Sequence, residues 1–166
     1  TQMKSVGEVM AIGRTFQESL QKAIRGLETG RDGLNEIFDD KEEIEILNQK
    51  ISTPSPDRLW YVGDAFRAGM LVEEVFFHSK IDPWFLVQVN DLIEEEKNLL
   101  NKSLKDLDAE TLYRLKSKGF SDSRIAFLVN ADEDKVRNLR KSLNILPVFK
   151  RVDTCAAEFE SSTAYM

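Results

Sequence analysis

The sequence contains few of the residues that commonly carry chemistry. Cys155 is its only cysteine and His78 its only histidine among 166 residues. A disulfide within the chain is therefore impossible, and zinc sites built from several Cys or His ligands are excluded. His78 follows two phenylalanines on a predicted amphipathic helix, and Cys155 has no histidine downstream that would activate its thiol. We interpret both as packing or surface residues.

The sequence also lacks signals for a membrane and for nucleotides. No apolar run approaches the roughly 18 to 20 residues of a membrane span, and no basic start followed by an apolar stretch indicates a signal peptide. The phosphate-binding pattern G-x-x-x-x-G-K-[ST] is missing, and Gly7 and Gly13 lie too far apart for G-x-G-x-x-G. We expect no cofactor in this chain and a cytoplasmic location.

Acidic residues outnumber basic ones, by 29 to 23, which gives a net charge of −6 and a pI near 5. Such a surface repels nucleic acid and anionic lipid at long range, so neither is an expected partner. The acidic runs 39–40, 42–43 and 94–96 are interpreted as solvated helix faces, because consecutive helical residues point in different directions and form no metal-binding loop.

Signals for short α-helices recur along the chain. Thr15 to Glu18 has the form of a capping box, and Gly30 is placed to end that helix in the left-handed conformation. Ser55 before Pro56 is a favourable helix start. The predicted helices cover approximately 15–28, 41–50, 56–69, 71–78, 83–100, 108–118, 121–130 and 132–141.

The predicted fold class is therefore all-α, with short amphipathic helices in one or two small helical subdomains and short extended flanking segments. Residues 148–159 have an extended composition that suits a short strand or a linker. Both ends of the chain are interpreted as cuts within a longer protein.

One segment could pass for a helix-turn-helix DNA-binding module. Residues 104–151 contain 11 basic and 7 acidic residues, and Arg137, Arg140 and Lys141 would approach DNA from the helix at 132–141. The three acidic residues 132–134 at the start of that helix oppose this interpretation, because they would meet the negatively charged groove.

Several blocks of sequence closely resemble the large chain of carbamoyl phosphate synthetases. Residues 3–15 resemble the end of its first ATP-grasp half, and residues 150–159 resemble the start of its second half. Further blocks between them are similar to the helical connecting region of the family, namely 59–61, 64–69, 81–86 and 118–122. The resemblance covers essentially the whole chain and is poorest over 28–55.

This resemblance implies three parts of the chain. Residues 1–28 would be the tail of the first (carboxyphosphate) ATP-grasp half, 29–149 the helical oligomerisation domain, and 150–166 the linker into the second (carbamoyl phosphate) half. The implied parent enzyme makes carbamoyl phosphate for arginine and pyrimidine synthesis. It would use bicarbonate, two ATP with Mg or Mn, and ammonia from a glutaminase small chain. The chain itself is expected to be structural, to self-associate and not to be an enzyme.

Three residues are candidates for function. The resemblance implies that Glu8 lies along an internal tunnel for a carbamate intermediate, whereas a structural salt bridge is the simpler interpretation. The name of the family's middle region implies self-association, for which Ile44 and Leu47 on the acidic helix 41–50 are the candidate interface residues. Both could equally face the core of the domain itself, because any packed helix shows an apolar stripe.

Overall fold

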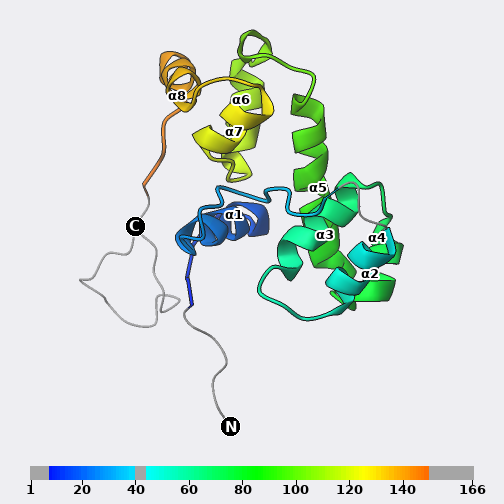
Figure 1. Ribbon diagram of the computed structural model, residues 1–166. Coiled ribbons are helices and arrows are strands. Elements are labelled where there is room, and N and C mark those ends of the chain that lie inside the picture. Colours follow the sequence, from blue (N-terminus) through cyan, green and yellow to red (C-terminus); the bar gives the residue numbers. More distant parts are fainter. Residues whose placement is uncertain (1–7, 40–43, 150–166) are drawn as a thin grey trace, which may run out of the picture.

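The computed structural model describes residues 8–39 and 44–149, and all regular structure in these ranges is helical (Figure 1). The all-α prediction is confirmed. The elements are α1 (Phe16–Gly26), α2 (Ile44–Ser52), α3 (Arg58–Arg67), α4 (Val72–Ser79), α5 (Pro83–Leu99), a 3-10 turn (Leu104–Asp106), α6 (Ala109–Ser117), α7 (Asp122–Leu128) and α8 (Glu133–Ser142).

The helices form two groups joined along α5, the longest of them. Helices α2, α3 and α4 pack on one another, and α3 and α4 pack on α5. The second group contains α6, α7 and α8, and it meets α5 through α7. Figure 1 shows α1 lying between the two groups, and the segment 31–38, here called the crossing segment, leads from α1 towards α3. The expectation was one or two small helical subdomains, and the structure has two helix groups that share one core.

Capping residues begin most helices where the sequence predicts them. The Thr15 hydroxyl accepts the Glu18 amide at 3.2 Å, and the Glu18 carboxylate accepts the Arg14 amide at 2.7 Å, so the predicted helix start is confirmed. Asp108 and Ser121 accept amides three residues on, at 2.8 and 2.9 Å. These bonds satisfy backbone donors that a helix leaves free at its start.

Two predicted boundaries are wrong. The first helix ends at Gly26, and the chain turns through Glu28, whose φ is +54°, before it reaches Gly30. Gly30 also has a positive φ, of +79°, but it lies in the following loop and caps no helix. Helix α3 begins at Arg58 rather than at Pro56, so Ser55 and Pro56 belong to the preceding turn.

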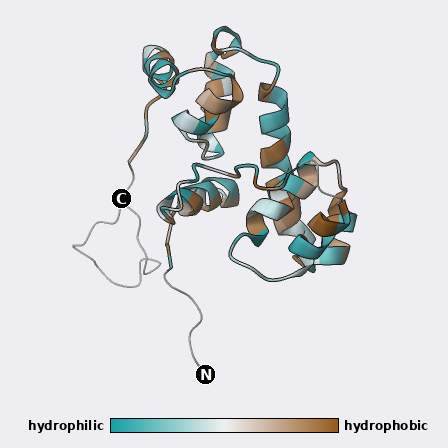
Figure 2. Cartoon of the chain, in the orientation of Figure 1, coloured by the Kyte–Doolittle hydropathy of each residue, from teal (hydrophilic) through white to brown (hydrophobic). Residues whose placement is uncertain are grey.

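Apolar side chains from both groups form one core. In Figure 2 the hydrophobic segments gather where α2 to α5 meet and on α6 and α7, whereas α8 is mainly hydrophilic. The largest fully buried apolar side chains are Phe66, Phe120, Ile24, Leu34, Leu47, Ile51, Leu86, Leu92, Ile93, Leu99 and Leu112. Burial of each such side chain stabilises the fold by about 1.5 to 3 kcal/mol before conformational entropy is subtracted.

Two glycines provide a test of this packing. A Cβ atom on Gly63, inside α3, would make only ordinary contacts, the nearest at 3.5 Å to Arg67 Nη1. Gly63→Ala should therefore raise the free energy of unfolding by about 0.5 to 1 kcal/mol, because alanine restricts the unfolded chain and favours the helix.

Gly119 has φ +90°, and a Cβ there would lie 3.0 Å from Glu18 Cα. Gly119→Ala should destabilise by more than about 1 kcal/mol in the same urea titration. Equal effects of the two substitutions would contradict the structure.

Candidate functional site: a buried ionic junction and an exposed face of α2 and α4

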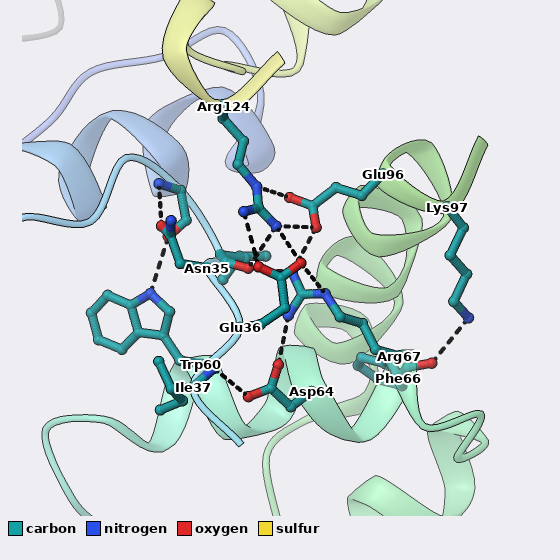
Figure 3. A network of polar contacts seen from close by, with 12 residues as sticks. Asn35, Glu36, Ile37, Trp60, Asp64, Phe66, Arg67, Glu96, Lys97 and Arg124 are labelled. Atoms are coloured by element: carbon teal, nitrogen blue, oxygen red, sulfur yellow. Dashed lines mark hydrogen bonds and ion pairs between the residues drawn. The ribbon is translucent and has the colours of Figure 1, made fainter. Parts of the chain in front are cut away.

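The most deeply buried charged group is the Arg124 guanidinium on α7, whose residue is 0% exposed. It donates from Nε and Nη2 to the two carboxylate oxygens of Glu96 on α5, at 2.8 and 2.7 Å. It also donates from Nη1 and Nη2 to Glu36 in the crossing segment, at 3.0 and 2.9 Å. Figure 3 shows the guanidinium between the two carboxylates. One side chain thus ties three separate parts of the chain together.

A second arginine extends this junction into α3. Arg67 donates to Glu96 at 2.6 Å and to Asp64 at 2.7 Å, and it also donates to the carbonyl of Leu34. The other oxygen of Asp64 accepts the amides of Ile37 and Phe38, at 3.0 and 2.9 Å (Figure 3). The crossing segment has little regular structure, so these side chains supply the partners that its buried backbone needs.

The titration of the junction follows from its contacts. Burial alone raises the pKa of Glu36, but the hydrogen bonds and positive charge of Arg124 outweigh burial, so that this pKa lies below its usual value. Burial likewise lowers the pKa of Arg124, and the carboxylates of Glu96 and Glu36 more than compensate, so the arginine pKa is raised. A carboxylate with a lowered pKa stabilises the fold above its unfolded pKa, and that contribution is lost as the pH falls through the folded pKa.

Removal of Arg124 tests the junction. Arg124→Met should lower the free energy of unfolding by about 3 to 5 kcal/mol, because Glu96 would stay buried without its main partner. Arg137→Met is the matched control, since the Arg137 side chain is 40% exposed and pairs mainly with Glu133 and Asp134 on its own helix, with only a long contact of 3.8 Å to Asp122. That control should cost less than about 1 kcal/mol in the same urea titration. A similar cost for both substitutions would contradict the proposed importance of the junction.

The second candidate site is the outer face of α2 and α4. A shallow hollow there is lined by Ile44, Asn48, Met70, Glu73, Glu74, Phe77 and His78. Ile44 is 48% exposed and Phe77 is 68% exposed, so apolar groups meet solvent on both sides of it. Among the side chains that the structure describes, the Asn48 carbonyl oxygen is the one buried polar atom without a hydrogen bond. This atom has almost no accessible surface, so it belongs to the floor of the hollow rather than to its open face.

The structure separates the two predicted interface residues. Ile44 lies on the exposed face, whereas Leu47 is fully buried in the core beneath α2. Leu47 therefore holds α2 onto the rest of the domain and is not available to another molecule. The interface hypothesis rests on Ile44, and the structure adds Phe77 and Asn48 to it. Half-buried His78 lies at the edge of the hollow, beside the ring of Phe77.

Glu8 lies on an extended segment that precedes α1. Residues 8–14, here called the strap, alternate between exposed and half-buried positions, and Glu8 is on the exposed side. The strap is held because the carbonyl of Ile12 accepts Lys22 Nζ at 3.1 Å. A Cβ on Gly26 would lie 2.6 Å from Val9 Cγ2, so the strap passes directly over that glycine. The alternative interpretation of Glu8, a salt bridge, has no counterpart among the ion pairs that the structure describes for residues 8–39 and 44–149.

The arginines of the alternative DNA-binding interpretation are already engaged. Arg140 donates to Asp122 at 2.9 Å and to the carbonyl of Ile145 at 2.8 Å. Arg137 pairs with Glu133 and Asp134 on its own helix. Both would have to give up these contacts to approach DNA, and Glu133 and Asp134 still occupy the start of α8.

Other site classes find no support in the described ranges. Within residues 8–39 and 44–149, no group of three or more His, Cys, Asp or Glu side chains is arranged to hold a metal ion. No helix in these ranges is long and apolar enough to cross a membrane. The acidic run 42–43 and Cys155 lie outside the described residues, as does most of the predicted strand or linker 148–159.

The described part of the chain is an all-α unit with a buried ionic junction and an exposed apolar face, which is the architecture of a small helical domain. Comparison with known proteins agrees. The family model described as carbamoyl-phosphate synthetase large chain, oligomerisation domain, matches residues 8–144. The chain belongs to this family.

Curated relatives extend the match over the whole chain. A carbamoyl phosphate synthase large chain of Pasteurella multocida is 60% identical over 166 residues, which are 100% of this chain and 15% of the relative. Large chains of Pseudomonas syringae and Pseudomonas aeruginosa are each 56% identical over 168 residues, which are 16% of each relative. The chain thus spans about one sixth of the length of these relatives.

Proposed function

We propose that this chain is the non-catalytic self-association module of a carbamoyl phosphate synthase large chain. In this proposal it connects the two ATP-grasp halves of that chain, with residues 1–28 and 150–166 as the flanking parts. The single observation that supports self-association is the exposed face of α2 and α4, where the apolar side chains of Ile44 and Phe77 line one hollow and are 48% and 68% exposed. A second copy of the chain would cover these apolar groups.

The interface is tested by a charge at Ile44. Light scattering across a concentration series should show a larger species that accumulates as concentration rises, and Ile44→Glu should shift its formation to at least tenfold higher concentration. A buried carboxylate without a partner opposes association strongly. Tyr113→Glu, at an exposed site on α6, is the control and should leave the mass curve unchanged.

An unchanged mass curve for Ile44→Glu would place the contact between copies elsewhere. A monomer at all concentrations would contradict self-association through this chain and leave it as a connecting scaffold. No specific observation favours the DNA-binding alternative. A salt-sensitive shift of duplex DNA by the chain would nevertheless overturn the present proposal.

The activity of the parent is also part of the proposal. The full-length enzyme would use bicarbonate, ATP with Mg or Mn, and ammonia released by a glutaminase small chain. Its phosphorylation sites would lie outside this chain. Glu8 would face the path of the carbamate intermediate, where a carboxylate can orient an N–H group or exchange a proton.

Glu8→Gln in the full-length enzyme tests that role. Bicarbonate-dependent ATP hydrolysis should persist while the yield of carbamoyl phosphate per ATP falls severalfold, because the intermediate would be lost before its second phosphorylation. Glu45→Gln, at an exposed position on α2, is the control. An unchanged ratio of product to ATP in Glu8→Gln would assign Glu8 a structural role only.

A further inference from the structure

An aromatic cluster lies on the surface where α1 meets the beginning of α5. The rings of Phe16, Trp84 and Phe85 contact one another edge to face, with centroids separated by 5.4, 5.2 and 5.0 Å. Trp84 is still 55% exposed and Phe85 43% exposed, and Phe16 is half buried. Such edge-to-face contacts fix the rings in place. The cluster is therefore a preformed apolar surface that nothing in the described part of the chain covers.

The strap runs along α1 up to this cluster: Val9 lies against Gly26 at the far end of α1, the Ile12 carbonyl meets Lys22, and the chain then enters the helix at Phe16. Its half-buried residues Val9 and Ala11 alternate with exposed Met10 and Ile12, and Ile12 precedes Phe16 by only four residues. An extended segment whose outer side is apolar is expected to be covered. The polypeptide that precedes α1 therefore runs beside this helix and ends at the cluster.

The size of this surface distinguishes between its possible occupants. Aromatic side chains contribute about 150 to 250 Å² each, so the exposed parts of these rings amount to only a few hundred Å². A stable contact between separate molecules needs about 800 Å² on each partner. A partner within the same polypeptide needs less, because the covalent tether supplies a high effective concentration. About five sixths of each large-chain relative lies outside the region that matches this chain.

We infer that the Trp84 cluster is the docking surface for an apolar surface of the ATP-grasp half that precedes this module in the large chain. This inference rests on the proposed position of the chain between the two halves. The strap would bring that half to α1, and the Trp84 and Phe85 rings would enter its surface. The cluster is then separate from the face of α2 and α4, so docking and self-association occupy different surfaces.

Hydroxyl-radical footprinting with mass spectrometry tests the inference, because it measures the accessibility of each side chain. The experiment compares this chain with the full-length large chain at the same radical dose. Trp84 and Phe85 should be oxidised readily in this chain and at least fivefold more slowly in the full-length protein. In full-length Trp84→Ser, oxidation of Phe85 should rise towards its rate in this chain, and Tyr113→Ser should leave it unchanged.

Two results would overturn the inference. Equal oxidation rates of Trp84 and Phe85 in the two proteins would show that the cluster stays open to solvent. Protection that appears in this chain alone as its concentration rises would identify a second copy as the occupant. Phe77 reports separately on the face of α2 and α4. If Phe77 is protected from oxidation while Trp84 is oxidised readily, docking is refuted and self-association stands. If Trp84 is protected while Phe77 is oxidised readily, docking stands and self-association through the face of α2 and α4 is refuted.

Discussion

The guanidinium group of Arg124 has no access to water, and this constraint organises much of the structure. A buried arginine cannot give up its proton, so its five donors need acceptors from the protein. Glu96 and Glu36 provide them from two distant parts of the sequence. These contacts fix the position of α7 on α5 and the path of the crossing segment between the two helices. Arg67 and Asp64 then extend the same network into α3.

Further polar contacts attach α1 and the turn between α6 and α7 to this arrangement. Lys118 pairs with Asp91 and Glu95 on α5, and Gln21 on α1 donates to the carbonyl of Lys118. The two helix groups are thus joined by ionic and hydrogen-bonded contacts as well as by apolar packing. On the proposals made above, one group carries the self-association face and the junction of α1 with α5 carries a docking surface. A rigid connection between them would keep neighbouring copies and domains in fixed relative positions.

Local features of the fold were predictable from the sequence because their causes are local. Capping residues such as Thr15, Asp108 and Ser121 lie within three residues of the amides that they accept. The end of α1 was harder to predict, because Glu28 adopts the left-handed conformation that usually favours glycine. A sequence can also contain two possible helix starts close together. Ser55 and Pro56 favour a helix start, but α3 begins two residues later, directly after Asp57.

The candidate sites were less predictable because they depend on contacts between distant residues. No periodic pattern distinguishes Arg124, at 0% exposure, from Arg137 on α8, whose side chain is 40% exposed, since the partners of Arg124 lie 28 and 88 residues away. The apolar stripe of α2 fitted both an interface and a core, and the structure divides it between exposed Ile44 and buried Leu47. The pattern of the helix at 83–100 does not indicate that Trp84 and Phe85 are exposed, because their exposure depends on how α1 packs on α5.

Differential scanning calorimetry of this chain and of Arg124→Met tests most directly whether the ionic junction makes the two helix groups one unit. The present account predicts a single transition for the unmodified chain, with a calorimetric enthalpy equal to the van't Hoff enthalpy. It also predicts that Arg124→Met broadens or divides that transition, because the groups would then unfold separately. Two transitions in the unmodified chain, or an equally cooperative transition in the variant, would contradict the account.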